Sequence, residues 1–548
     1  MVISRNGVPE ILKSKILSIS FPILAASLSG VLLFLAFPDY ELWWLGWVAL
    51  VPLLVALNGR STKHTFLLSC LCGVVFFTGV FGWIFEIPKF GLVHYATISP
   101  YTALYFALFG LCFNLILNRL GVAWACAAAP FIWTSLEYIR SNASFLSLPW
   151  ALLAHSQYQN PIVIQIASVT GAYGVSFLIV LVNAAIALLF SSVAHPLVSG
   201  KAPVSRMART LFTGFTACLV GTTLVYGHLA ISKPISGKEV KATVIQGNIS
   251  RTMKANPMRY AEFIMGKYIR LTREAPTDEA ELVLWPEAAT PGFVLKHLTL
   301  RKQMISLVRE VRRYFLIGSS EYPKFIKDRE FKRGEAGNTA LFFSPGGKVL
   351  GQYLKIHLVP FGEYIPLDGV VSWPTFIVPE DKRNFEVPGT EYTLFRMDGA
   401  RFGVVICWEI VFPRLFSEFV KRGANFMVNL TNEGWFGETA APYQMLSMSV
   451  FRSVENRIAM VRAANTGISC FIDPLGRVTA RVENNGKEIF VEGYLTRAIP
   501  LSQEQTFYAQ YGDTFVYFAF LAAIGLVLFA LSARKRGVPK RQDERGIS

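Results

Sequence analysis

Eight apolar runs, each close to the length needed to cross a lipid bilayer, set the first constraint on this 548-residue chain. A helix needs about 20 residues to span the roughly 30 Å of hydrocarbon in a membrane. Seven of the runs fall in the first 231 residues, and one lies near the end of the chain. They cover residues 15–37, 42–57, 65–87, 97–117, 121–139, 166–192, 210–231 and 514–533. The sequence therefore predicts a helical membrane bundle of eight spans.

Between the seventh and the eighth run lies a long segment with the composition of a soluble domain. The whole chain is 52% hydrophobic and only 16% charged, below the roughly 25% charged residues of soluble proteins. We therefore predict four parts of the chain. They are a membrane bundle (1–231), an α/β domain (232–513), an eighth span (514–533) and a basic tail (534–548).

The distribution of the net charge of +16 along the chain indicates membrane topology and not a nucleic-acid-binding face. Residues 232–513 hold 36 basic and 30 acidic residues, and the rest of the chain holds 17 basic and 7 acidic ones. Threading eight spans places 15 of those 17 basic residues on one side, and only Lys89 and Arg140 on the other. Basic loops mark the cytoplasmic side. We expect cytoplasmic termini and a 232–513 domain outside the cytoplasm, on the periplasmic face of a bacterial inner membrane.

From residue 239 onward the hydrophobic period changes, and short β-rich runs alternate with helical patterns. The helical patterns cover about 257–273, 298–313, 411–421 and 440–457. Pro345-Gly346-Gly347 marks a hairpin turn between two further strands. Because the strands are almost continuously apolar, the pattern predicts an α/β sandwich with buried sheets.

Three reactive side chains stand where predicted strands end: Glu287, Lys355 and Cys407. A Cys that follows a buried strand and precedes a turn into a helix is well placed for a nucleophile, because a helix N-terminus and a nearby Lys favour the thiolate. Glu287 is expected to act as general base and acid, and Lys355 to hold an oxyanion and lower the thiol pKa. Each residue alone also fits an ordinary structural role, so the prediction rests on their combination.

Three motifs carry a family resemblance. They are LWPE (284–287), Tyr-x-Lys-x-His-Leu-x-Pro-Phe-Gly-Glu (353–363) and Ile-Cys-Trp-Glu-Ile-x-Phe-Pro (406–413). In this order and spacing they resemble the Glu–Lys–Cys pattern of the nitrilase, or carbon–nitrogen hydrolase, superfamily. With the eight spans and the segment 148–177, nearly the whole chain resembles the bacterial apolipoprotein N-acyltransferases. The resemblance implies an αββα nitrilase fold seated on a membrane bundle.

The resemblance also implies roles for named residues. Cys407 would be the nucleophile, Glu287 the general base and Lys355 the third member of the triad. Four further residues would support this triad. Glu363 would be a second carboxylate near the thiol, and Trp408 and Glu409 would flank the nucleophile. Trp435 would line the acyl-entry region.

The reaction that the resemblance implies has two steps and needs neither cofactor nor metal. Cys407 would take an acyl chain from a phospholipid, phosphatidylethanolamine, as a thioester. The α-amine of an S-diacylglyceryl-cysteine at a lipoprotein N-terminus would then accept the chain. The partners are thus a phospholipid donor, diacylglyceryl apolipoproteins and membrane lipid, with no nucleic acid, and the enzyme is expected to be a monomer.

Two positions depart from the family pattern: Ala255 stands where a Trp is common, and Glu433 follows Asn432 where an Asp is common. In the spans, Glu137 and Glu86 are interpreted as interface charges that reach toward water, with pairing of Glu137 and Arg140 as the alternative for Glu137. The apolar loop 370–378 fits either a membrane-contacting arm or ordinary core.

Two other functions remain open from the residues alone. A membrane-tethered amidase would use the same triad with water as acceptor, although eight spans favour a lipid substrate. A non-catalytic exported domain of a transporter is the second, but the spans lack paired intramembrane charges and inverted repeats.

Overall fold

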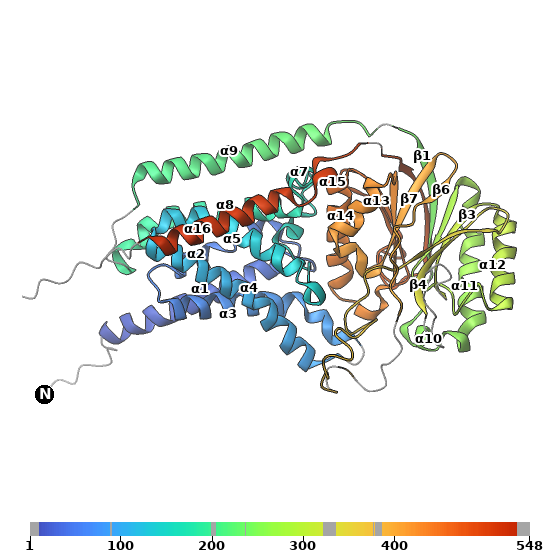
Figure 1. Cartoon of the computed structure of the whole chain (residues 1–548), viewed down its shortest axis with the longest axis horizontal. Helices are drawn as coiled ribbons and strands as arrows, with labels where there is room; N and C mark the ends of the chain where they lie inside the picture. Colours follow the sequence, from blue (N-terminus) through green and yellow to red (C-terminus); the bar gives the residue numbers. More distant parts are fainter. Residues whose placement is uncertain are drawn as a thin grey trace, which may run out of the picture.

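A computed structural model of the chain describes residues 10–87, 90–198, 204–235, 237–321, 336–375, 378, 386–502 and 504–533. Helices gather at one end of the molecule and two β-sheets at the other, as Figure 1 shows. Lys89 and the basic tail 534–548 of the predicted topology lie outside the described residues.

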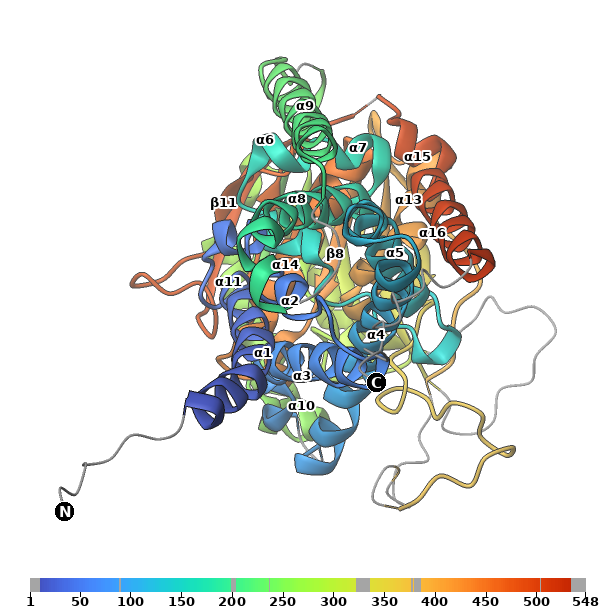
Figure 2. The same ribbon diagram turned by 90° about the vertical axis from the view of Figure 1, so that its left-hand side faces the viewer.

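The helical end is built from seven long helices and several short ones. The long helices are α1 (Glu10–Leu35), α3 (Thr62–Val80), α4 (Leu92–Arg119), α5 (Val122–Ser141), α8 (Ala172–Val198), α9 (Arg206–Ile231) and α16 (Thr514–Ser532). Within the described residues, six helices are long and apolar enough to cross a membrane: α3, α4, α5, α8, α9 and α16. Figure 2 looks onto this end and shows α9 at the edge of the group.

The predicted span 42–57 is not one membrane-length helix. It folds as a 3₁₀ turn, η1 (Trp43–Trp47), and a helix of six residues, α2 (Val51–Ala56), with a proline in its first turn. At 1.5 Å per residue, α2 is about 9 Å long and too short to cross a bilayer. Irregular backbone is tolerated at membrane depth where neighbouring side chains satisfy it.

Two polar side chains from other helices provide this support. Asn183 of α8 accepts from the Leu50 N–H at 2.8 Å and donates to the Gly46 carbonyl at 2.9 Å. Ser29 of α1 accepts from the Leu53 N–H at 2.9 Å. The break in the helix is therefore part of the packed bundle.

The predicted span 166–192 also begins later than expected. Two short helices, α6 (Pro161–Ile164) and α7 (Ala167–Thr170), come first, and α8 starts at Ala172. Gly171, with φ +66°, makes the turn between α7 and α8. Only glycine fits at this position, because a Cβ there would lie 2.5 Å from the Tyr508 ring.

The other end of the molecule holds two six-stranded sheets. The first has the order β12-β1-β2-β3-β4-β5 and the second the order β11-β10-β9-β8-β7-β6. The strands are β1 (Glu239–Gln246), β2 (Leu282–Trp285), β3 (Tyr314–Glu321), β4 (Gly337–Phe343), β5 (Val349–Leu354), β6 (Phe395–Met397), β7 (Ala400–Ile406), β8 (Phe426–Thr431), β9 (Ala459–Ala464), β10 (Cys470–Ile472), β11 (Val478–Arg481) and β12 (Gly493–Pro500). In each sheet three neighbouring strands are parallel: β1-β2-β3 and β7-β8-β9.

Helices cover both outer faces of the sheet pair. On the first sheet lie α11 (Ala261–Glu274) and α12 (Leu298–Val311), and on the second lie α13 (Pro413–Lys421) and α14 (Ala441–Asn456). This is an αββα sandwich, in agreement with the nitrilase-like fold expected from the motifs. Figure 1 shows α14 between the second sheet and the bundle. Only Tyr443 of the 16 residues of α14 is not buried, so bundle and sandwich share one core through this helix.

Candidate active site

Glu287 follows strand β2 by two residues and lies 6% exposed between the two sheets. Its Oε1 accepts from Asn338 Nδ2 at 2.7 Å, and its Oε2 accepts from the Asn432 N–H at 2.8 Å. Asn338 belongs to the first sheet and Asn432 directly follows a strand of the second, so donors from both sheets hold the carboxyl group in a fixed orientation. Burial raises the pKa of Glu287, and the nearby Lys355 partly offsets this effect.

Lys355 follows strand β5, and its side chain is completely buried. Its Nζ lies 2.5 Å from Glu363 Oε1 and 3.8 Å from Glu287 Oε1. The other Glu363 oxygen accepts from the Val359 N–H at 2.8 Å, which folds the loop back on itself. Burial alone would lower the pKa of Lys355, but the carboxylates of Glu363 and Glu287 hold it well above its ordinary value.

Cys407 follows strand β7 and has φ +52°, a left-handed conformation that is uncommon outside glycine. This sharp turn leaves the thiol half-buried at the strand end, where a hydrogen bond from Cys407 lowers the pKa of Glu287. The described cysteines, Cys470 included, are all free.

The net effect on the thiol differs from the sequence-based expectation of a favoured thiolate. Burial raises the pKa of Cys407 above its ordinary value, Glu287 adds to this effect, and Lys355 opposes it. The turn after Cys407 is η7 (Cys407–Val411), a 3₁₀ segment of five residues rather than a long helix. The resting site therefore holds a neutral thiol beside a carboxyl group that is also easier to protonate than usual.

Glu409 connects the turn at Cys407 to the residues on either side of Lys355. Its two carboxylate oxygens accept from the Ile406 and Ile356 N–H groups, both at 2.7 Å, and from the Tyr353 hydroxyl. Burial raises the pKa of Glu409 to about 7. Glu409 is thus a structural link behind the thiol, whereas Trp408 packs on the bundle side of Cys407 against Trp150.

Trp435, the residue expected at the acyl entry, is 44% exposed. It belongs to η8 (Glu433–Phe436), directly after strand β8. Its neighbour Phe436 is packed edge-on against Trp83 of the bundle, with ring centroids 5.1 Å apart. The segment η8 therefore lies where the sandwich meets the bundle.

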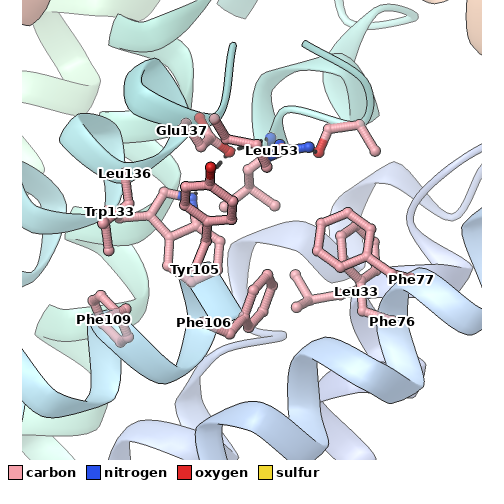
Figure 3. Close-up of a pocket in the computed structure, with 12 residues that line it drawn as sticks. Leu33, Phe76, Phe77, Tyr105, Phe106, Phe109, Trp133, Leu136, Glu137 and Leu153 are labelled. Atoms are coloured by element: carbon pink, nitrogen blue, oxygen red, sulfur yellow. Dashed lines mark hydrogen bonds between the residues drawn. The ribbon is translucent and has the colours of Figure 1, made fainter. Parts of the chain in front are cut away.

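One cavity in the bundle, drawn in Figure 3, is distinct from this site. Aromatic rings of α3, α4 and α5 line it, together with Glu137 and Arg140. Its free volume is about 20 Å³, which is room for about one water molecule and not for an acyl chain.

The interface role expected for Glu137 is wrong, because its side chain is buried, as is that of Arg140. Arg140 is 3% exposed and donates to the carbonyls of Trp150 and Leu148 at 2.6 and 3.1 Å. Glu137 accepts from the Leu153 N–H at 2.8 Å. The two charges hold the segment between α5 and α8 in place.

Comparisons with known proteins match both halves of this architecture. Residues 29–185 match the family described as "Apolipoprotein N-acyltransferase N-terminal domain", and residues 241–507 match "Carbon-nitrogen hydrolase". An apolipoprotein N-acyltransferase from Geobacter metallireducens is 34% identical over 94% of this chain and 96% of its own length. The chain belongs to the apolipoprotein N-acyltransferase family. The family resemblance carried by the three motifs is thereby confirmed, and the nitrilase-like domain is that of an acyltransferase.

Other similar proteins belong to the same family or superfamily. An apolipoprotein N-acyltransferase from Chlorobaculum tepidum is 28% identical over 94% of this chain and 98% of its own length. Among solved structures, an amidase of the nitrilase superfamily from Nesterenkonia AN1 is 18% identical over 50% of this chain and 93% of its own, with a TM-score of 0.35.

The two departures from the apolipoprotein N-acyltransferase pattern lie beside the site. Glu433 and Arg462 form a completely buried ion pair, and the Ile468 N–H donates to Glu433 at 3.2 Å. Ala255 is exposed, and the preceding Lys254 donates to the carbonyl of Ala288, the residue after Glu287. Burial lowers the pKa of Lys254 to about 7, against the pull of Glu287.

Glu433→Ala is expected to destabilise this acyltransferase by about 3–5 kcal/mol, because Arg462 would keep a buried charge without a partner. Thermal unfolding of the purified protein measures this effect. Arg422→Ala, which removes an exposed helix pair with Glu418, is the control and should change stability by less than about 1 kcal/mol. Equal effects of the two substitutions would contradict the structural role of Glu433.

Two residues of the acyltransferase site escaped sequence analysis. Asn338, in strand β4, had no recognisable signal because its role depends on β4 lying beside the end of β2. Glu386 lies between strands β5 and β6 and carries no local motif, yet its backbone N–H donates to the Glu363 carbonyl at 3.1 Å, and one of its carboxylate oxygens is buried without a hydrogen-bond partner. Burial raises the pKa of Glu386 to about 8, and the negative charge of Glu363 adds to this effect.

This raised pKa makes stability depend on pH in a defined direction. Between the usual value near 4.5 and about 8, the folded state binds more protons at Glu386 than the unfolded state, so stability falls as pH rises through this window. Glu386→Gln removes the effect. The unfolding temperature of the variant minus that of the wild type should therefore rise by about 2–4 °C from pH 5 to pH 8.5. A difference that is flat over this range would contradict the assignment.

Proposed function

We propose that this apolipoprotein N-acyltransferase uses Glu287, Lys355 and Cys407 to move an acyl chain from phosphatidylethanolamine to the α-amine of an S-diacylglyceryl-cysteine. The observation that carries the proposal is the buried group of Glu287, Lys355 and Glu363, with Cys407 at an adjoining strand end. The bundle in the same chain supports lipid substrates, because their reactive ester groups lie at the membrane surface.

In the first step the Cys407 sulfur attacks an ester carbonyl carbon of the phospholipid. Glu287 takes the thiol proton and returns it to the glycerol oxygen, which leaves as lysophospholipid. Burial raises the pKa of Glu287, which makes it a stronger acceptor for the thiol proton than an ordinary carboxylate. The Lys355 ammonium, held by two carboxylates, donates to the oxyanion that forms on the carbonyl.

In the second step the lipoprotein amine attacks the thioester carbonyl, and Glu287 accepts the amine proton. The C–S bond breaks, the thiol is regenerated and an amide is formed. Shielding of the thioester from water between the steps favours the amine over hydrolysis.

The first test of this proposal supplies phosphatidylethanolamine and a synthetic diacylglyceryl peptide to the enzyme in detergent. We expect lysophospholipid and N-acylated peptide in equal amounts, measured by mass spectrometry. Free fatty acid without N-acylated peptide would instead indicate the tethered amidase, in which water is the acceptor.

We also propose that the 232–513 domain lies on the periplasmic side, that both termini are cytoplasmic and that the enzyme acts as a monomer. The distribution of basic residues supports the orientation. The bundle contained in each chain supports the monomer, because no second subunit is needed to reach the membrane.

Cysteine labelling tests the orientation. A membrane-impermeant maleimide added to spheroplasts should react with Asp368→Cys, an exposed position of the α/β domain, and not with Lys63→Cys or Ser548→Cys. Lysed membranes provide the control in which all three should react. Labelling of Lys63→Cys from outside would overturn the topology.

A further inference from the structure

The indole of Trp408, the residue after Cys407, is held by ring contacts and not by a hydrogen bond of its own. Its Nε1 is buried and has no partner. The ring is stacked on Trp150, with centroids 5.8 Å apart and planes 20° from parallel, and lies edge-on to Phe412 at 6.0 Å. The orientation of Trp408 beside the nucleophile therefore depends on the position of Trp150.

Trp150 is in turn fixed by Gln444 of α14. The completely buried Trp150 donates from Nε1 to Gln444 Oε1 at 2.6 Å. Trp83 donates to the same oxygen at 3.2 Å, and its ring lies 5.2 Å from that of Trp150. A buried indole N–H requires an acceptor, so this one amide oxygen determines where both rings lie.

The other half of the Gln444 amide is bound to the bundle. Its Nε2 donates to the Val80 carbonyl at 3.2 Å and to the Pro38 carbonyl at 3.4 Å. Indoles only donate and carbonyls only accept, so the amide can take just one orientation. Gln444 is 3% exposed, and all four of its hydrogen-bonding positions are used.

The same amide also supports η8 through Trp83. The ring of Trp83 lies edge-on to Phe436 at 5.1 Å, and Phe436 is the neighbour of the exposed Trp435. Gln444 thus connects the ends of α1 and α3 to Trp408, the residue after Cys407, and to Phe436 of η8.

We propose that Gln444 is a positioning residue for acyl transfer: its amide fixes Trp150, and through Trp150 it sets Trp408 beside the acyl group on Cys407. The membrane bundle thereby determines the geometry of the catalytic centre. This inference rests on the proposed function, since it assumes that Cys407 is acylated.

Gln444→Met tests the proposal because it keeps the chain length and removes the amide. Single-turnover acylation of Cys407 by phosphatidylethanolamine, followed by intact mass, should slow by about 10- to 100-fold, the cost of a displaced reacting group. Ser447→Ala is the matched control on the same helix, since that hydroxyl donates only within its own helix, to the Gln444 carbonyl. It should acylate within about twofold of the wild type.

Circular dichroism separates positioning from a general loss of structure. Two stacked indoles give an exciton couplet, and Trp408→Phe should remove the couplet of the Trp408–Trp150 pair while leaving that of Trp83 and Trp150. Gln444→Met should weaken the same couplet, and Ser447→Ala should retain it. Acylation by Gln444→Met within about threefold of the wild type, or slow acylation with an intact couplet, would overturn the proposal.

Gln444→Glu gives a second test that does not depend on Gln444→Met folding. A protonated carboxyl group can accept from both indoles and donate to the Val80 carbonyl, whereas an ionised one has no proton for Val80 or Pro38. Its acylation rate relative to the wild type should be highest near pH 6 and fall toward pH 9. A constant ratio over this range would overturn the proposal, while a wild-type enzyme that forms no thioester would instead refute the proposed function.

Discussion

Cys407→Ala is expected to reduce N-acylation of a diacylglyceryl peptide by about 10⁴- to 10⁶-fold, the range expected when a covalent nucleophile is removed. Without the sulfur no thioester can form, and the remaining groups can only bind the two lipids. The measurement is the rate of N-acylated peptide formation by mass spectrometry at a fixed phosphatidylethanolamine concentration.

The matched control for this loss is Cys470→Ala. Cys470 is the other cysteine of the α/β domain, completely buried in β10. Its replacement should leave the transfer rate within about threefold of the wild type. Turnover by Cys407→Ala at a tenth of the wild-type rate or more would exclude Cys407 as the nucleophile.

Glu287→Gln is expected to lower the rate of Cys407 acylation by about 10²- to 10⁴-fold, the usual contribution of a general base. The amide has the same shape as the carboxyl group but cannot accept the thiol proton. Its carbonyl can still accept one of the two hydrogen bonds, from Asn338 or from the Asn432 N–H. The fold should therefore persist while the proton transfer fails.

A half-buried carboxylate away from the candidate site gives the comparison for this variant. Glu418 lies on the surface of α13, where it pairs with Arg422 one turn away. Glu418→Gln should acylate Cys407 at the wild-type rate, and both variants should unfold within a few degrees of the wild type. A normal thioester yield from Glu287→Gln at early times would refute its role as the base.

The sequence predicts three reactive side chains because each lies where a strand ends. Glu287, Lys355 and Cys407 each follow a short apolar run that the structure shows as β2, β5 and β7. Such positions can be recognised locally, from hydrophobic pattern and motif. The αββα arrangement could be expected from the same motifs, and the family comparison confirms the membership that they indicated.

What the sequence could not provide depends on contacts between distant segments. The break in the predicted span 42–57 is stabilised by Ser29 and Asn183, and neither has a local signal. Glu386 and Gln444 likewise acquire their roles only when loop and helix meet the site and the bundle. The raised pKa of Cys407 has the same origin, because burial exceeds the effect of Lys355, which sequence motifs cannot weigh.

The most direct test of the central claim is the intact mass of the detergent-purified protein after incubation with phosphatidylethanolamine. The account predicts a gain of one acyl chain that hydroxylamine removes and that Cys407→Ala does not acquire. A wild-type protein that releases lysophospholipid but carries no acyl chain on Cys407 at any time would contradict the thioester mechanism.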